Sequence, residues 1–505
     1  MLVHFEVPAD LQPEVEARLS YAFRLFCAIY GHTPSVGTKP AQHCDVTIRY
    51  LNESARNSTA DAETVWLCRG YRGRDRRQPA PAPLRFQRQG LSTVLHYEPQ
   101  GDESPDWLGE IFEWVSCADE YSVSERDRIG RPLYRATYAG RHSLDMRVPY
   151  AALAMRGLQQ EICRVLPRAS ANPQAPEGVK GHVVIPTHDV DYFPLSRVHT
   201  VNRLARNAVI SCLIGDGPML ALRQAGHAIR VALGAKDDPL DQINALAAEE
   251  QNQGFSASYY FLVRNAHRLD ARYSLETPGV VESMRWLLAR GMEIGLHGSF
   301  TSLDALGGLE DEADAIQRRG ISPQGSRQHW LHFTLERLIP AIESAGLQYD
   351  ASIGWSTRVG FRAGACFAFP PYDFAKERPA NFLELPLIVM DQALHAPDGG
   401  EEQRFQEAAQ VLAASRELGW GGVTLLWHPA AFGSGWLAPE IGKVFWRLAA
   451  DRLCRNDQWM PSLHFLELAR ERFVQAGLLS NTAQTRVIEM SLQEASHQAA
   501  AEVTA

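Results

Sequence analysis

The chain has 505 residues, and at about 150 residues per domain this length favours three domains or two large ones. Hydrophobic residues make up 45% and charged residues 22%, which is ordinary for globular protein and excludes a chain that is disordered throughout. Fifty Lys and Arg stand against 59 Asp and Glu, and the resulting net charge of −9 argues against a general nucleic-acid binder.

Targeting and cysteine features of the sequence favour a cytoplasmic protein. The first ten residues lack a basic stretch followed by an apolar one, so we expect no secretory signal. No apolar run reaches about 18 residues, so no transmembrane helix is predicted. The eight cysteines never occur at CxxC spacing, which argues against a structural zinc cluster and favours free thiols in a reducing compartment.

The N-terminal third, residues 1–166, predicts a smaller accessory α/β domain. Apolar residues at helical spacing predict helices over 15–30 and 108–115. The run CDVTIRYL at 44–51 predicts a strand. No cluster of ligand-type side chains stands out, so the role of this domain stays open.

Two segments mark boundaries. Three prolines among few apolar residues predict a linker over 167–180. From residue 479 to 505 the sequence is rich in Ala, Gln, Ser and Glu and lacks aromatics, which predicts a low-complexity C-terminal tail. The main domain is therefore expected over 181–478.

Short apolar runs alternate with helical stretches over 181–478. Predicted strands lie at 182–186, 256–263, 293–296, 348–353, 382–390 and 423–427. Predicted helices between them include 240–254, 279–290 and 334–345, and a helical insertion is expected over about 195–250. This alternation predicts a parallel sheet, most simply a barrel.

Ionisable residues follow the predicted strands repeatedly. They are Asp189 and Asp191, His297, Arg327 and His329, and His428. Residues i and i+2 of a strand share a face, so Asp189 projects with Asp191, and Arg327 with His329 if 326–331 is extended. Two adjacent carboxylates repel each other unless a cation neutralises them. A metal on one carboxylate, or Arg beside the other, would relieve this repulsion, and a metal site with a separate general base needs that arrangement.

At this point the residues resemble a known family. The motifs are THDVD at 187–191, EIGLHGS at 293–299, Arg327, Tyr349-Asp350 and LLWH at 425–428. Their order is similar to that of the polysaccharide deacetylases (the NodB-homology family, carbohydrate esterase family 4). The runs GFRAG at 360–364, VMD at 389–391 and the stretch 111–132 resemble a bacterial subgroup with an extra N-terminal domain, often linked to surface-polysaccharide biosynthesis.

The resemblance implies a fold and a set of roles. The fold is a distorted seven-stranded (β/α) barrel, and the activity is hydrolysis of N-acetyl groups with one divalent metal ion, for which zinc is the first expectation. Carried onto this chain, Asp189 is the general base, Arg327 its orienting partner and His428 the general acid. Asp191 and His297 are metal ligands. The implied substrate is a carbohydrate, in a surface polysaccharide or its precursor.

Two departures from the family pattern bear on the metal. The family usually has two adjacent aspartates, whereas this chain has Asp-Val-Asp; a D-x-D variant also occurs in the family, and the shared strand face makes it physically sensible. The second metal histidine normally lies four residues after the first, and here Thr301 occupies that position. A hydroxyl is a poor zinc ligand beside imidazole. His329 is the candidate third ligand; without it the metal would be weakly held or absent.

Less specific interpretations remain open for each residue. The aspartates also suit a helix cap, Arg327 a structural ion pair, His329 a packed histidine and His428 a plain loop residue. Trp330, Trp355, Tyr372 and Trp427 suit either sugar stacking or the core. Two other functions stay open: a hydrolase of small cyclic or linear amides on the same barrel, and a non-catalytic glycan-binding protein with a decayed site.

One segment departs from the acidic balance of the chain. Residues 197–236 carry six Lys or Arg and one acid, with apolar residues at helical spacing. A basic amphipathic pair of helices suits peripheral contact with an anionic membrane, and a lipid-linked carbohydrate would fit that location. The alternative is a helical hairpin packed on the barrel or on a second subunit of a homo-oligomer.

Overall fold

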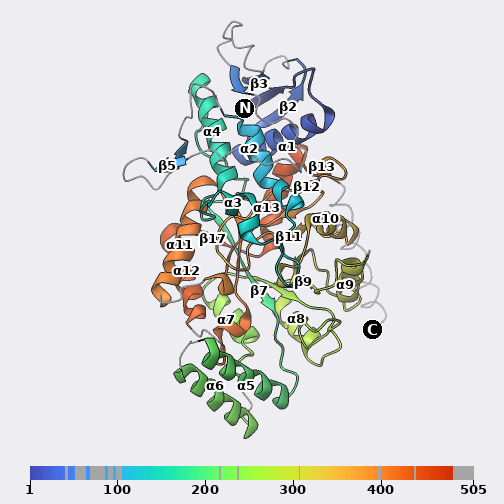
Figure 1. The fold of residues 1–505 in the computed structure, drawn as a ribbon, viewed down its shortest axis with the longest axis vertical. Helices are drawn as coiled ribbons and strands as arrows, with labels where there is room; N and C mark the ends of the chain where they lie inside the picture. Colours follow the sequence, from blue (N-terminus) through green and yellow to red (C-terminus); the bar gives the residue numbers. More distant parts are fainter. Residues whose placement is uncertain are drawn as a thin grey trace, which may run out of the picture.

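The structure is a computed structural model of the full chain (Figure 1). It describes residues 1–39, 44–51, 64–68, 86–88, 95–97, 105–214, 218–235, 238–305, 307–394, 400–436 and 440–481. The predicted C-terminal tail therefore lies almost wholly outside the described residues. Within the described ranges, no helix combines the length and the apolar character needed to cross a membrane.

The N-terminal part contains a parallel sheet of order β2-β1-β3-β4. Its strands are β1 (Leu2–Glu6), β2 (Thr33–Gly37), β3 (Val46–Leu51) and β4 (Thr64–Cys68). The helices of this part are α1 (Pro13–Tyr30), α2 (Trp107–Val115), α3 (Tyr138–Arg141) and α4 (Tyr150–Val165). Helix α1 begins with Pro at its first position and ends at Gly31, whose φ of 71° suits glycine. The helices and the strand expected here are all present.

Short elements complete the N-terminal part. They are the antiparallel pair β5 (Phe86–Arg88) and β6 (Leu95–Tyr97) and the 3-10 turns η2 (Ala118–Ser122) and η3 (Tyr134–Ala136).

The second part is built on an all-parallel sheet of order β14-β11-β10-β9-β8-β7-β16-β15. Its strands are β7 (Val183–Val190), β8 (Ser258–Phe261), β9 (Glu293–Gly298), β10 (Gly325–Gln328), β11 (Tyr349–Asp350), β14 (Leu383–Glu384), β15 (Leu387–Met390) and β16 (Gly421–Leu426). The short β17 (Gln458–Trp459) also pairs with β7. The expected α/β class with a parallel sheet is confirmed.

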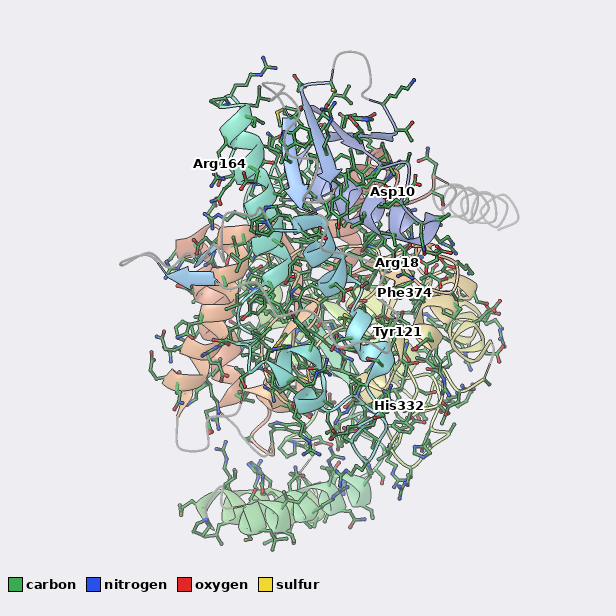
Figure 2. All side chains as sticks on the ribbon, turned by 45° about the horizontal axis from the view of Figure 1, so that its top comes forward. Asp10, Arg18, Tyr121, Arg164, His332 and Phe374 are labelled. Atoms are coloured by element: carbon green, nitrogen blue, oxygen red, sulfur yellow. The ribbon has the colours of Figure 1, made fainter. Side chains whose placement is uncertain are left out.

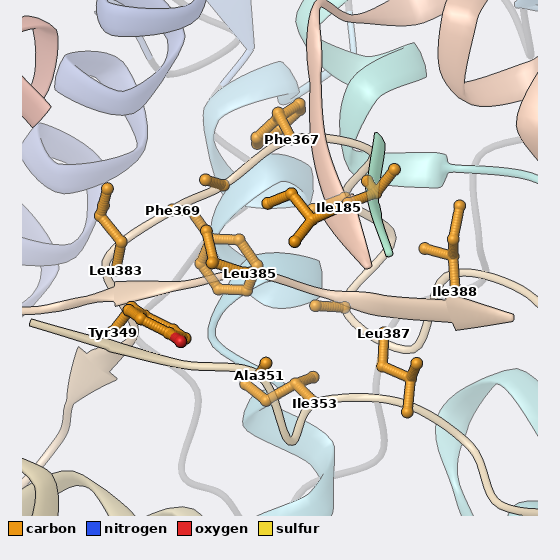
Figure 3. Close-up of a cluster of buried hydrophobic side chains, with 14 of the residues drawn as sticks. Ile185, Tyr349, Ala351, Ile353, Phe367, Phe369, Leu383, Leu385, Leu387 and Ile388 are labelled. Atoms are coloured by element: carbon orange, nitrogen blue, oxygen red, sulfur yellow. The ribbon is translucent and has the colours of Figure 1, made fainter. Parts of the chain in front are cut away.

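The two outer members of this sheet, β14 and β15, are one extended segment interrupted at Leu385 and Pro386. Its first half pairs with β11, and its second half pairs with β16. The backbone N–H of Leu385 donates to the carbonyl of Asp350 over 2.8 Å, while the carbonyl of Pro386 accepts from the N–H of Thr424 over 2.9 Å. Figure 3 shows this segment between the chain around Ala351 and the strand that carries Ile185. The sheet therefore curls round into a distorted barrel with seven strand positions among the described residues.

Helices surround the barrel strands. They are α5 (Arg197–Ile214), α6 (Pro218–Ala232), α7 (Ile243–Asn252), α8 (Val280–Leu288), α9 (Gly308–Gln317), α10 (Leu335–Ser344), α11 (Glu401–Leu418), α12 (Ile441–Arg455) and α13 (Ser462–Gln475). Short elements between them are η4 (His329–Leu331), β12 (Tyr372–Asp373), β13 (Arg378–Pro379), η5 (Asp391–Ala393) and η6 (Pro429–Phe432). The expected helical insertion consists of α5 and α6, followed by α7.

The N-terminal part and the barrel share one hydrophobic core. Arg362 of the barrel pairs with both carboxylate oxygens of Glu120 at 2.8 and 2.6 Å, and both side chains are largely buried. In the region where Figure 2 labels Arg18, Phe374 and Tyr121, the Arg18 guanidinium lies 5.2 Å from the Phe374 ring centroid. The domain boundary at 167–180 stays a prediction, and the two parts pack as one body.

Candidate metal centre and catalytic cluster

The carboxyl ends of the barrel strands bring six predicted site residues together. Asp189 lies near the end of β7 and Asp191 directly follows that strand, His297 lies on β9, Arg327 on β10, His329 after β10 and His428 after β16. In the register of β9 and β10, His297 lies beside Arg327. Because parallel strands present their carboxyl ends at one edge, residues far apart in sequence meet there.

Three of these residues form a cluster suited to a metal ion. One ligand atom from each of Asp191, His297 and His329 lies within 4.8 Å of the other two. The Nε2 atoms of His297 and His329 lie 3.3 and 3.5 Å from Oδ1 of Asp191. Tetrahedral zinc, with ligand distances near 2.0–2.1 Å, separates its ligand atoms by about 3.3 Å. The two distances to Asp191 therefore match the separation of ligand atoms around such an ion.

Hydrogen bonds fix which imidazole nitrogen faces the centre. Nδ1 of His297 lies 2.9 Å from the carbonyl oxygen of Arg327, which only accepts, so Nδ1 carries the hydrogen and Nε2 keeps a free lone pair. Nδ1 of His329 lies 3.4 Å from a carboxylate oxygen of Asp270. Both rings thus direct Nε2 at Asp191.

The carboxylate of Asp191 also suits a cation at this position. Its Oδ1 atom is buried and has no partner within hydrogen-bond geometry, and the imidazoles of His297 and His329 face it at 3.3 and 3.5 Å. A buried oxygen without a partner is costly unless a cation satisfies it. Three protein ligands of the Asp-His-His type, with further coordination left open, are the arrangement of catalytic rather than structural zinc sites.

His329 reaches the cluster from a turn and not from an extended strand. Strand β10 ends at Gln328, and the next residues form η4. Trp330 and Leu331 have φ of 64° and 51°, the left-handed region that such residues rarely adopt. This turn places His329 beside His297, with ring centroids 4.9 Å apart. Thr301 lies in the turn after β9.

Arg327 holds Asp189 on the inner side of the site. The guanidinium is fully buried, and Nη1 donates to Oδ1 of Asp189 over 3.0 Å. Its other donors bind the Ala351 carbonyl and the hydroxyls of Thr187 and Thr424. Oδ2 of Asp189 is left facing Nε2 of His297, 3.7 Å away. One carboxylate oxygen is therefore anchored and the other faces the candidate metal position.

His428 lies on the opposite side of Asp191 and is held by Asp391. Nδ1 of His428 is 3.0 Å from both carboxylate oxygens of Asp391, and the backbone N–H of His428 donates to the same group over 2.9 Å. The Nε2 atom lies 3.5 Å from Oδ2 of Asp191. The ring is therefore fixed by one carboxylate and directed at the other.

The charges of the cluster shift its titrations strongly. Burial alone would raise the pKa of Asp191, but the imidazoles of His329, His297 and His428 outweigh burial and hold it well below the usual range. Burial alone would lower the pKa of His428, but the charges of Asp391, Asp191 and Asp189 raise it to about 10. In the same way Asp191 and Asp270 raise the pKa of His329 to about 9. A cation bound by His329 would therefore displace its proton.

The site meets solvent at Asp191, whose side chain is 30% exposed while the other five are nearly buried. Trp330, adjacent to His329, is 40% exposed. Its indole N–H donates to the carbonyl of Leu269, and Arg131 of the N-terminal part binds its carbonyl oxygen over 2.9 Å. By contrast Trp355, Tyr372 and Trp427 are buried in the core. Of these four aromatics only Trp330 is exposed, and its ring centroid lies 5.8 Å from that of His329.

Sequence reasoning left two positioning residues without a role. Asp391 holds His428, and Asp270 holds His329. Asp391 follows a predicted strand, and that position was a usable signal. Asp270 lies in an irregular stretch between β8 and α8, where no periodicity distinguishes it from a loop residue.

No family model matches the sequence, and no curated protein matches it. Among solved structures, peptidoglycan deacetylase PdaC from Bacillus subtilis is 12% identical, with 58% of this chain and 94% of that chain covered and a TM-score of 0.28. The catalytic domain of a peptidoglycan N-acetylglucosamine deacetylase from Eubacterium rectale is 10% identical, with 58% and 93% covered and a TM-score of 0.27.

A third match is a mutant of a carbohydrate esterase family 4 pseudoenzyme with restored enzymatic activity. It is 9% identical, with 57% of this chain and 68% of that chain covered and a TM-score of 0.26. At such TM-scores the functional argument rests on the geometry of the site itself.

Proposed function

We propose that the protein is a metal-dependent amide hydrolase that removes N-acetyl groups from an amino sugar of a surface polysaccharide or its precursor. The observation that carries this proposal is the Asp191, His297 and His329 cluster, flanked on one side by Asp189 with Arg327 and on the other by His428 with Asp391. A base, an acid and a cation position thus surround one opening. The sugar itself is inferred from the resemblance of the motifs.

Asp191, His297 and His329 would hold the ion, which when bound supplies Lewis-acid activation of water and of the acyl oxygen. Oδ2 of Asp189 accepts the proton of the attacking water, while Arg327 fixes Oδ1 and favours the ionised carboxylate. Water adds to the acetamide carbon, and the carbon–nitrogen bond then breaks. His428 donates its Nε2 proton to the leaving amine. The products are acetate and the free amino sugar.

The direct test is metal content followed by acetate release. We expect near one zinc, manganese, cobalt or nickel per chain in protein purified without added metal or chelator, measured by elemental mass spectrometry. Acetate release from N-acetylated glycans should then stop when the ion is removed and return when it is restored. A chain that contains no metal and takes up none on dialysis against zinc would contradict the proposal and favour a glycan-binding role.

Replacing Asp391 by Asn should lower kcat by about tenfold to a hundredfold, because His428 loses the charge that keeps it protonated. His428 acts while protonated, so activity is lost as pH rises through its pKa. Asp391 raises that pKa, and its removal should move the basic limb of the pH–rate profile to lower pH. A lower kcat with an unmoved basic limb would contradict this role of Asp391.

Replacing Trp330 by Ala should raise KM for a glycan substrate by about tenfold with little change in kcat, because the exposed indole beside His329 offers an apolar face to a sugar ring. Trp286→Ala on α8, where the ring stacks on Arg290, is the matched control and should leave KM unchanged. Equal KM values for Trp330→Ala and the unmodified protein would assign Trp330 a purely structural role.

A substrate series from N-acetyl sugars to small cyclic amides separates the two hydrolase alternatives.

A further inference from the structure

Exposed apolar side chains are concentrated on the α5–α6 hairpin. Of the eleven large hydrophobic residues that are exposed in the described part of the chain, eight lie within 195–233. They are Leu195, Val198, Val209, Leu213, Met219, Leu222, Ile229 and Leu233. Scattered exposed leucines are normal, but a gathering of this kind marks an interaction surface.

The periodicity of α5 places its apolar residues on one outward side. Val198, Ala205, Val209 and Leu213 are exposed and follow one another at helical spacing. The opposite side, which includes Leu204 and Asn207, is buried. One side of α5 therefore packs against the protein, and the other side is exposed and apolar.

Helix α6 repeats this arrangement. Met219, Leu222, Ile229 and Leu233 form an exposed apolar stripe, whereas Ala221, Gln224, Ala228 and Val231 are buried. The two helices pack along each other, and Ser211 donates to Gln224 across their contact over 2.9 Å. Their outer sides thus form one apolar face, which we call the hairpin face.

The Lys, Arg, Asp and Glu residues within the two helices are all basic. Arg197, Arg206, Arg223 and Arg230 are exposed. Residues 195–214 and 218–235 contain neither Asp nor Glu. The net charge of the whole chain is −9, so the charge of this apolar face is opposite in sign to that of the protein as a whole. Apolar residues flanked by arginines are the composition of helices that lie in the interface of an anionic membrane.

The inner side of the hairpin rests on the rim of the candidate site. Leu204, Ala228 and Val231 pack against Tyr192 and Ala430, which are close neighbours in sequence of Asp191 and His428. Asn207 and Gln224 donate to the carbonyls of Gly435 and Trp436 over 3.0 Å each. Figure 1 shows α5 and α6 at the end of the molecule opposite the N-terminal sheet. The hairpin face therefore lies about one helix diameter, ~10 Å, from that rim.

We propose that the hairpin face docks the protein on an anionic membrane surface and brings the rim of the site close to lipid headgroups. A second copy of the chain is the competing occupant. A two-fold dimer through this face would bring the same basic patch of both subunits together, since such an interface joins identical patches. The charge of the face therefore favours lipid over a second copy. This inference concerns location and does not depend on the proposed reaction.

The test is co-sedimentation of the full chain with vesicles of phosphatidylcholine containing about 30% phosphatidylglycerol, compared with pure phosphatidylcholine. We expect binding to the anionic vesicles that is released at high salt. Arg206→Ser with Arg223→Ser should weaken binding about thirtyfold, because each arginine contributes about fivefold. Leu213→Ser with Ile229→Ser should also weaken it, whereas Leu453→Ser, at an exposed leucine on α12, should not.

The outcomes separate the occupants. No binding to anionic vesicles, or equal binding by the Leu213/Ile229 variant, would overturn the proposal. A dimer in light scattering that this variant converts to monomer, without vesicle binding, would assign the face to a second copy. Vesicle binding does not depend on the proposed reaction. Asp189→Asn, which should lack hydrolase activity, should therefore bind vesicles as the unmodified chain does. All these hairpin substitutions are at exposed positions and should preserve the fold, which thermal unfolding checks.

Discussion

Asp189→Asn should lower kcat by about 10³-fold while the protein keeps its metal, because an amide cannot accept the proton of the attacking water. Asn still offers an oxygen to the Arg327 guanidinium, so the buried cation retains a hydrogen bond. The carboxylate is not among the three candidate ligands, so metal content should stay near that of the unmodified chain. Acetate release and elemental mass spectrometry on the same preparation measure both.

The control for this substitution is Asp304→Asn, which removes a carboxylate from an exposed ion pair with Arg337. That change should leave kcat unaltered.

Asp189→Asn, which removes the charge opposite buried Arg327, should lower the free energy of unfolding by about 3–5 kcal/mol, because a buried charge loses its partner. An Asp189→Asn protein that is folded, holds metal and turns over at the normal rate would eliminate Asp189 as the base.

His329→Gln should reduce metal affinity by more than about a hundredfold and abolish activity at limiting metal. Loss of a residue that only orients a ligand typically costs 10–100-fold in affinity, and loss of the ligand itself should exceed this. Asp191 and His297 alone would remain, which is the weak site expected for a chain with Thr301 in place of the usual histidine. Competition against a fluorescent zinc chelator measures the affinity.

His332→Gln is the matched control for His329. The His332 ring stacks on Phe300 at 4.1 Å between centroids, and its Nδ1 contacts the Phe300 carbonyl, outside the cluster. It should keep full metal affinity. If His329→Gln binds zinc as tightly as His332→Gln, His329 is a packed histidine and the third ligand must come from elsewhere.

The barrel could be predicted from the sequence where strands are apolar and end in a polar residue. The runs at 182–186, 293–296 and 423–427 overlap β7, β9 and β16, and each of these is a buried strand of a parallel sheet. Strand β10, Gly325–Gln328, could be expected only conditionally. Its residues are mostly polar and yet buried. Arg327 can be buried because its guanidinium donates to groups from three other strands or loops of the barrel.

Other features depended on three-dimensional context. The sequence predicts one strand over 382–390, whereas an interruption at Pro386 divides it into β14 and β15. Strand β14 pairs with β11, and β15 pairs with β16. The left-handed backbone at Trp330 and Leu331 contains no glycine, the residue that usually marks such a turn in a sequence. The orientation of the His329 side chain toward the cluster could therefore not be predicted from the sequence. The position of Asp391 after a strand could be read from the sequence, but its pairing with His428, which joins two loops, could not.

The closure of the barrel has a consequence for biosynthesis. Strand β7 is buried over its whole length and pairs with β16, where Val183 lies opposite Gly421. A ribosome releases β16 long after β7, so the nascent chain holds an apolar strand with one unpaired edge until synthesis is nearly complete. Such an edge invites wrong pairing with other chains. Chains truncated before β16 should therefore aggregate and need a chaperone to stay in solution.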